Sequence, residues 1–169
     1  STWNPELIRQ MGRVIAIEAS AQGAHIGYGP VLDLARDPRW SRVEETYGED
    51  PYLNGVMGTA LERGSQGETL NDGKSVIATL KHFASYGWTE GGHNGGTAHI
   101  GERELEEAIF PPFREAVGAG ALSVMSSYNE IDGNPCTGSR YLLTDILKDR
   151  WQFKGFVVSD LYAVGGLRG

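Results

Sequence analysis

The stretch SVIATLKHF, residues 75 to 83, decides the fold class of this chain. Its apolar residues follow one another almost without a break, which is typical of a parallel strand covered on both faces. A helical pattern opens at Asp50-Pro51 before this stretch, and another opens near Gly101-Glu102 after it. Strands that alternate with helical patterns predict βαβ units and a parallel sheet.

The same alternation extends along the rest of the chain. Apolar residues recur at helical spacing after the capping signals Asn4-Pro5 and Ser139. Pro111-Pro112 is expected to kink or shorten the third helix. The other expected strands are residues 26–34, 122–130 and 156–160, where Phe156 to Val158 is read as buried, and Gly64 is expected to end the second helix.

An open doubly wound sheet and a closed (β/α)₈ barrel both fit this order of elements. A barrel takes about 250 residues, so about four β/α units in a chain of 169 residues correspond to half of one. The chain starts at a helix-entry signal without Met and ends just after a strand. We therefore expect residues 1–169 to be a fragment of a larger protein.

Composition argues against several classes of protein. The formal net charge is −7, whereas a nucleic-acid surface needs clustered Lys and Arg. No apolar run approaches the roughly 20 residues that span a bilayer, so no membrane partner is expected. The single cysteine, Cys136, rules out an internal disulfide.

Polar side chains follow each expected strand. Arg42 lies in the segment after the first strand, Lys81-His82 end the second, Tyr128 follows the third and Asp160 ends the fourth. Because the carboxyl ends of parallel strands converge on one face, we expect these side chains to meet there. That face is where active sites are found in such folds.

Each of these positions also has a purely structural interpretation. Asp160 could cap the next helix or lie in a solvated loop. Lys81-His82 could be a packed histidine beside an exposed lysine, and Tyr128 could belong partly to the core. Arg42 could form an ion pair with Glu44, Glu45 or Glu49. Their common placement at strand ends favours the functional interpretation.

Other kinds of site fit the sequence poorly. The histidines and glutamates around the segment EGGHNGG lack the tight spacing of a metal motif such as HExxH. The same segment is not a phosphate-binding loop, and no GxSxG motif occurs. Cys136 lies in a Gly/Pro loop without any sign of activation. Neither a metal nor an organic cofactor is expected.

Four motifs resemble glycoside hydrolase family 3 in their order and spacing. They are PRWSRVEETYGEDPYL (38–53), TLKHF (79–83), MSSYNEIDGNP (125–135) and GFVVSD (155–160). The family holds β-glucosidases, β-xylosidases and related exo-acting enzymes, and the resemblance covers essentially the whole chain. It implies that residues 1–169 form part of an N-terminal (β/α)₈ catalytic barrel of TIM type in a multidomain enzyme. The α/β sandwich domain that follows in the family is absent from this sequence.

The resemblance also implies roles for individual residues. Asp160 matches the nucleophile, which attacks the anomeric carbon and forms a covalent glycosyl-enzyme. Lys81 and His82 match a pair that hydrogen-bonds sugar hydroxyls in the non-reducing-end subsite, and Arg42 matches an arginine that also holds the sugar. Nearby cations would favour the ionised nucleophile. The matches at the subsite wall are Met125 and Tyr128.

A second carboxyl group, needed about 5–5.5 Å from a retaining nucleophile, has no match here. In most of the family this acid/base comes from the second domain. In the N-acetylglucosaminidase branch it is a histidine after a pattern like KHFPGHGDT, and KHFASYGWTEGG disfavours that branch. His93 is a poor substitute. The acidic residues Glu44, Glu45, Glu49 and Asp50 match a family segment without an acid role.

Two departures from the family are visible. Leu161 follows the nucleophile where the family often has Trp, which puts aromatic stacking on the aglycone side in doubt. Ser41-Arg42 replaces a Gly-Arg pair and keeps the arginine.

The resemblance implies a retaining, exo-acting hydrolase that removes β-D-glucosyl residues from the non-reducing ends of β-glucosides and oligosaccharides. The alternatives are a β-D-xylosidase of the same family and a non-catalytic carbohydrate-binding homologue. The family also implies a secreted or periplasmic bacterial enzyme. We expect the 169-residue chain alone to be inactive and poorly folded, because half a barrel leaves strand edges and helix stripes unburied.

Overall fold

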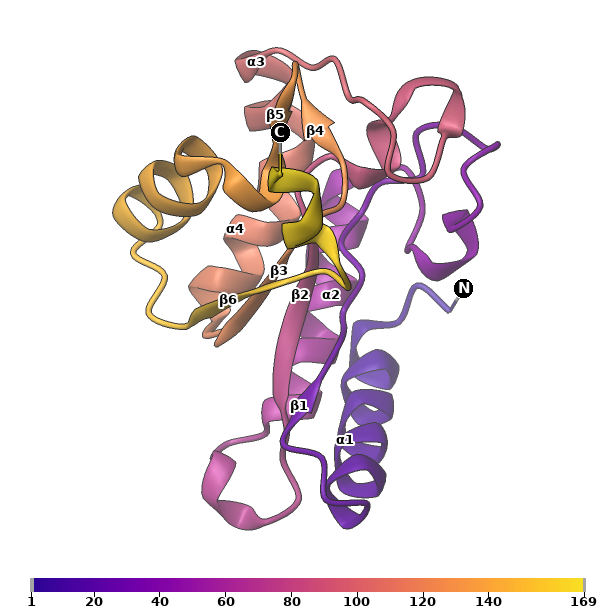
Figure 1. The fold of residues 1–169 in the computed structure, drawn as a ribbon. Coiled ribbons are helices and arrows are strands. Elements are labelled where there is room, and N and C mark those ends of the chain that lie inside the picture. The colour runs from indigo at the N-terminus through magenta and orange to yellow at the C-terminus, as the bar shows by residue number, and fades with distance from the viewer. Residues whose placement is uncertain (1, 169) are drawn as a thin grey trace.

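The computed structural model describes residues 2–168, which are built around a parallel sheet (Figure 1). Its neighbours follow the order β1-β2-β3-β6, and each pairing is parallel. The order follows the chain without the reversal that marks a doubly wound sheet, as in a barrel. The predicted α/β class is therefore confirmed. The strands are β1 (Ile26–Gly27), β2 (Ile77–Phe83), β3 (Ser123–Ser126) and β6 (Phe156–Ser159).

The helices begin where the capping signals place them. Side-chain oxygens of Asn4, Asp50 and Ser139 each accept a hydrogen bond from the backbone N–H three residues later, at 3.1, 2.7 and 3.2 Å. Figure 1 shows α1 beside α2, and both α2 and α4 contact β2. The helices are α1 (Pro5–Ala21), α2 (Pro51–Gln66), α3 (Glu102–Glu104) and α4 (Phe110–Ala119), with π-helical segments at Leu105–Ile109 and Tyr141–Arg150.

The first expected strand, residues 26–34, is wrong in its length, because regular pairing stops at Gly27. Pro30 interrupts it, since proline has no N–H to donate to a ladder. The chain nevertheless stays beside β2: Lys81 N donates to Pro30 O at 3.1 Å, and Leu32 N donates to Lys81 O at 2.6 Å. Residues 31–34 therefore still reach the carboxyl end of the sheet.

The third expected strand, residues 122–130, divides into two elements. Only β3 (Ser123–Ser126) joins the sheet, whereas β4 (Glu130–Ile131) forms a hairpin with β5 (Asn134–Pro135). Asp132 and Gly133 make the turn with φ of 48° and 84°. An Asp-Gly pair adopts such left-handed geometry more readily than most residues, and it is a strong local hairpin signal.

The prediction that Gly64 ends the second helix is wrong, because α2 continues to Gln66 and Gly67 follows it with φ of 62°. Gly64 instead lies where α2 crosses α1. A Cβ at this position would come within 2.1 Å of the Arg9 carbonyl oxygen. The absence of a side chain therefore lets the two helices approach each other.

Pro111-Pro112 do not shorten the third helix. Helical backbone runs from α3 through the π-helical segment Leu105–Ile109 into α4, where the prolines occupy the first turn. The wider π turn accommodates two residues that offer no N–H to the preceding carbonyls.

β6 is less buried than its apolar sequence predicts. Phe156 is 41% exposed, and Val157 and Val158 are only half-buried. Among residues 2–168, β6 pairs only with β3, so one edge of the strand has no neighbour. The packed core lies between the sheet and the helices, around Leu80, Phe83, Phe110 and Phe113. No helix in the described part of the chain is long and apolar enough to cross a membrane.

Candidate active site

Asp160 follows β6 directly, at the carboxyl end of the sheet. Its backbone N–H donates to Ser126 O at 3.2 Å, which extends the β3–β6 ladder by one residue. The side chain is almost buried, and Oδ1 accepts a hydrogen bond from Leu161 N at 2.8 Å. Oδ2 accepts no hydrogen bond from any residue between 2 and 168. One carboxylate oxygen thus keeps its lone pairs available for chemistry.

Neither structural interpretation of Asp160 holds. The next helical turn, Ala163–Leu167, has Tyr162 in its cap position, and the Asp160 side chain does not bond to that turn. With 9% of its surface exposed, Asp160 is not a solvated loop residue either. Burial of a carboxylate costs desolvation free energy. At Asp160, neither helix capping nor a position in solvent accounts for that cost.

His82 joins Asp160 to a second buried carboxylate. Its Nε2 lies 3.5 Å from Asp160 Oδ2, and its Nδ1 lies 2.6 Å from Asp33 Oδ2. Asp33 Oδ2 also accepts a hydrogen bond from the His82 backbone N at 3.1 Å. The His82 and Asp33 side chains are each only 1% exposed. The imidazole is thus fixed between two carboxylates that belong to different segments.

Tyr86 packs against the ring of His82. Its ring meets the His82 ring edge-on at 4.8 Å, and its centroid lies 5.8 Å from that of Tyr128. The guanidinium of Arg42 lies over the Tyr86 ring, 5.2 Å from the centroid. Burial raises the pKa of the Tyr86 hydroxyl. Tyr86 therefore links the histidine, the arginine and the second tyrosine into one wall.

Arg42 forms the ion pair that its spacing allowed. Its Nε and Nη2 contact the two carboxylate oxygens of Glu45 at 2.5 and 2.8 Å. The hydrogen bond from Arg42 is the largest cause of a lowered Glu45 pKa, and the charge of Lys81 lowers it further. Arg42 lies over the ring of Tyr86, which contacts His82, and Lys81 precedes His82 in β2. The three residues therefore lie in the same neighbourhood.

The two wall residues differ in exposure. Tyr128 is 38% exposed, and its pKa is raised by burial and then by the negative charge of Asp160. Met125 is only 4% exposed within β3, where it pairs with Val158. Tyr128 therefore lies at the surface beside Tyr86, and Met125 lies buried in the sheet beside β6. Their roles toward a sugar stay predictions.

Three carboxyl groups, those of Glu45, Asp50 and Asp33, are each engaged in other contacts than one with Asp160. Glu45 is held by Arg42, and Asp50 caps α2. Asp33 lies on the opposite side of the His82 ring from Asp160. The backbone carbonyl of His93 accepts from Thr89 Oγ1 in a tight turn.

The remaining histidines considered for a metal site lie apart from this group. His99 contacts Asp132 at 2.8 Å and Glu90 at 3.5 Å, and the hydrogen bond to Asp132 raises the His99 pKa. Between residues 2 and 168 no group of three or more His, Cys, Asp or Glu side chains is arranged to hold a metal ion.

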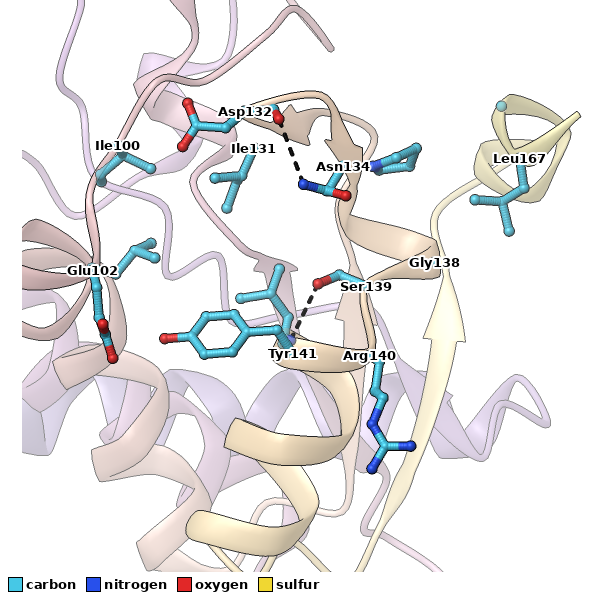
Figure 2. Close-up of a pocket in the computed structure, with 14 residues that line it drawn as sticks. Ile100, Glu102, Ile131, Asp132, Asn134, Gly138, Ser139, Arg140, Tyr141 and Leu167 are labelled. Carbon is cyan, nitrogen blue, oxygen red and sulfur yellow. Dashed lines mark hydrogen bonds between the residues drawn. The ribbon is translucent and has the colours of Figure 1, made fainter. Parts of the chain in front are cut away.

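A hollow of about 790 Å³ is lined by neither Asp33 nor Asp160 (Figure 2). It lies between the β4–β5 hairpin and the start of the segment Tyr141–Arg150, and Leu167 borders it. In Figure 2 the Tyr141 hydroxyl points toward Glu102 across the hollow. None of the six residues predicted for the site lines this hollow, so chemistry and not size identifies the candidate site.

Sequence reasoning missed two residues of the site. Asp33 stands as a single carboxylate within the apolar run VLDL, and this interruption was its signal. Tyr86 lies three residues after Phe83, in a loop whose path no periodicity predicts. Both are recognised only through their contacts with His82.

The chain matches known proteins along nearly its whole length. The family model described as glycosyl hydrolase family 3 N terminal domain matches residues 1–168. A β-xylosidase from Formosa agariphila is 48% identical over 99% of this chain and 24% of its own length. A periplasmic β-glucosidase from Salmonella typhimurium is 40% identical over 97% of this chain and 21% of its own length.

Solved structures agree as well. A β-glucosidase from Listeria innocua superposes with a TM-score of 0.94 at 40% identity, covering 96% of this chain and 23% of the solved one. A mutant of the same enzyme was solved in complex with laminaribiose, at 41% identity. The chain thus spans about a fifth to a quarter of the length of these relatives. The family domain has a TIM-barrel-type fold, so the predicted fold, part of such a barrel, is confirmed.

Proposed function

We propose, from the premise that this chain belongs to glycosyl hydrolase family 3, that the protein carrying it is a retaining, exo-acting β-glycosidase. Its substrate would be a β-linked glucoside or oligosaccharide, cleaved at the non-reducing end. The reaction would pass through a covalent glycosyl-enzyme on Asp160.

One observation carries this proposal: Asp160 Oδ2 is a buried carboxylate oxygen without a hydrogen-bond donor, 3.5 Å from His82 Nε2. A nucleophile needs an oxygen whose lone pair is not already committed, and Oδ1 takes the contact with Leu161 N that fixes the carboxylate.

The sugar would be held by the groups that surround Asp160. Arg42 and Lys81 offer N–H donors to vicinal hydroxyls, and His82 presents Nε2 to the same space. Tyr128 and Met125 would form the wall and floor of the subsite. Because Glu45 and Tyr86 already fix the arginine head group, binding would cost little side-chain entropy.

The acid/base would come from another part of the polypeptide. We place residues 1–169 within an N-terminal (β/α)₈ domain and assign the second carboxyl group to a following α/β sandwich domain. The length of the relatives, four to five times that of the aligned segment, supports this division. A secreted or periplasmic location is supported by the name of the Salmonella typhimurium relative.

A β-D-xylosidase is the second candidate, because the Formosa agariphila relative has a higher identity, 48%, than the Salmonella typhimurium β-glucosidase, 40%. A xyloside lacks the C6 hydroxymethyl group, so the two activities differ in one contact region. A panel of aryl β-glucosides and β-xylosides, measured as kcat/KM on the full-length protein, separates them.

The test of the proposed chemistry is to trap the glycosyl-enzyme. Incubation of the full-length protein with a 2-deoxy-2-fluoro-β-glycoside bearing a good leaving group should add one glycosyl unit. Peptide mass spectrometry should then place that unit on Asp160. A label on another carboxylate, or hydrolysis without retention of anomeric configuration, would overturn the proposal. A non-catalytic homologue would bind glucose and form no adduct.

A further inference from the structure

Asp33 is a buried carboxylate that does not border the proposed reaction directly. Its side chain is 1% exposed, and Oδ1 accepts no hydrogen bond from the part of the chain that the structure describes. Oδ2 contacts a single residue twice, through the backbone N of His82 at 3.1 Å and through its ring Nδ1 at 2.6 Å. Both contacts of this carboxylate therefore go to one histidine.

These two contacts require a hydrogen on Nδ1 of His82. A backbone N–H is always a donor, so Asp33 Oδ2 acts as an acceptor. A ring nitrogen at 2.6 Å from that oxygen must then be a donor as well, because two lone pairs would repel each other at this distance. Nδ1 carries the hydrogen, and Nε2 is left to face Asp160 Oδ2 at 3.5 Å.

The orientation of the ring is fixed by the same surroundings. A half-turn of the imidazole would place a carbon atom against Asp33 and leave the buried carboxylate without its ring donor, which is costly. Tyr86 meets the ring edge-on at an interplanar angle of 76° and limits intermediate orientations.

We propose that Asp33 is a positioning residue, which holds His82 with its hydrogen on Nδ1 so that Nε2 alone faces the rim around Asp160. The kinetic consequence rests on the proposed function, in which Nε2 is the atom of His82 that meets a sugar hydroxyl. Asp33 itself does not touch the substrate. Its influence on the reaction passes through the tautomer and the orientation of the imidazole.

The tautomer is measured without any reference to catalysis. The full-length protein is labelled with ¹⁵N-histidine, and the His82 ring signals are identified by their loss in His82→Gln. We expect wild-type Nδ1 to give an N–H correlation. In Asp33→Ala the Nδ1–H population should fall, whereas Asp33→Asn should retain it, because the amide oxygen replaces Oδ2 as acceptor. An unprotonated Nδ1 in the wild type, or signals unchanged in Asp33→Ala, would overturn the proposal.

The kinetic arm uses the same variants on an aryl β-glucoside. We expect Asp33→Ala to lower kcat/KM on the order of 10- to 100-fold. Losses of this size are typical when a partner that orients a metal-binding histidine is removed. Asp33→Asn should lose less. Asp72→Asn, which breaks a surface ion pair with Arg13, is the matched control and should keep wild-type kinetics. Equal losses in Asp33→Ala and Asp33→Asn would contradict a positioning role.

The two arms separate this proposal from the proposed function. If wild-type protein hydrolyses no β-glycoside, the proposed function fails, and the wild-type ¹⁵N spectrum still decides the tautomer. If Asp33→Ala does not fold, as judged by circular dichroism, the ¹⁵N spectra of the wild type and of Asp33→Asn together decide the tautomer. Protonated Nδ1 in both proteins supports the proposal, and unprotonated Nδ1 in either overturns it.

Discussion

Gly64 of α2 and Arg9 of α1 approach so closely that a Cβ on Gly64 would lie 2.1 Å from the Arg9 carbonyl oxygen. Gly12 of α1 makes the reciprocal approach, with its virtual Cβ 2.6 Å from Leu61 O. The two helices therefore meet backbone to backbone, which explains why α1 buries Gly12 and Ala16 while its larger apolar residues stay partly exposed.

This contact predicts that Gly64→Ala destabilises the protein although alanine favours helix. Overpacking costs about 1–3 kcal/mol, and here the obstacle is backbone, which cannot move aside like a flexible side chain. Urea unfolding of the full-length protein, followed by circular dichroism, measures the change. Gly118→Ala is the control, because nothing lies within 4 Å of its virtual Cβ in α4. It should be neutral or stabilise by up to about 1 kcal/mol, and a harmless Gly64→Ala would contradict the close packing.

Asp160→Asn should abolish turnover while sparing sugar binding. The amide keeps an oxygen for Leu161 N, so the loop is retained, but it cannot attack an anomeric carbon. We expect kcat to fall on the order of 10⁴-fold or more, with the Kd for glucose changed only a few-fold. Steady-state kinetics and calorimetry measure the two quantities. Near-normal turnover in this variant would exclude Asp160 as the nucleophile.

Glu45→Gln should weaken substrate binding by releasing Arg42. The ion pair at 2.5 and 2.8 Å fixes the guanidinium, and the neutral amide replaces only part of it. We expect KM for an aryl β-glycoside to rise roughly tenfold, with a smaller effect on kcat. Glu44→Gln is the matched control on the adjacent carboxylate. Should both variants raise KM equally, the Arg42–Glu45 pair would have no special part in binding.

Glu62 predicts a pH-dependent stability that is unrelated to the site. Its side chain is buried in α2, Oε1 accepts from Gln66 Nε2 at 2.7 Å and Oε2 accepts nothing from residues 2–168. Burial raises the pKa of Glu62 from 4.5 to about 7. The folded state therefore holds the proton more tightly than the unfolded state, and this contribution is complete below pH 4.5 and is lost as the pH rises through 7.

Glu62→Gln should remove that dependence. The difference in free energy of unfolding between variant and wild type should grow in favour of the variant between pH 4.5 and 7, by up to about 3 kcal/mol, and then level off. Denaturant unfolding at several pH values measures it. A difference that is flat across this interval would show that Glu62 titrates normally.

The elements predicted from the sequence are those encoded by nearby residues. The starts of three helices could be predicted because a capping side chain bonds to a backbone N–H only three residues later, as at Asn4, Asp50 and Ser139. The prediction for Gly64 is wrong because the missing side chain serves a contact with α1, about fifty residues away in the sequence, and not the local backbone. The hairpin at Asp132-Gly133 did carry a local signal, but the preceding apolar run obscured it.

The candidate site shows the same division. Lys81, His82 and Asp160 were predicted to share a rim because each ends a strand, and the register of the sheet then brings His82 within 3.5 Å of Asp160. Asp33 looked like one polar residue in a strand, and its pairing with His82 depends on a tertiary contact across 49 positions. Periodicity predicts which face a residue occupies, whereas only packing decides its partner.

The hydrogen bond from Asp160 N to Ser126 O ties this carboxylate to the sheet, while Leu161 and Tyr162 immediately after it are 68% and 88% exposed. The Asp160 carboxylate is therefore held by the sheet, whereas the two residues after it are not. If Asp160 attacks the sugar as proposed, substitutions at Leu161 or Tyr162 would change the surface that meets the leaving group without displacing the attacking oxygen. Substrate range would then change at this edge of the sheet while the reaction stays the same.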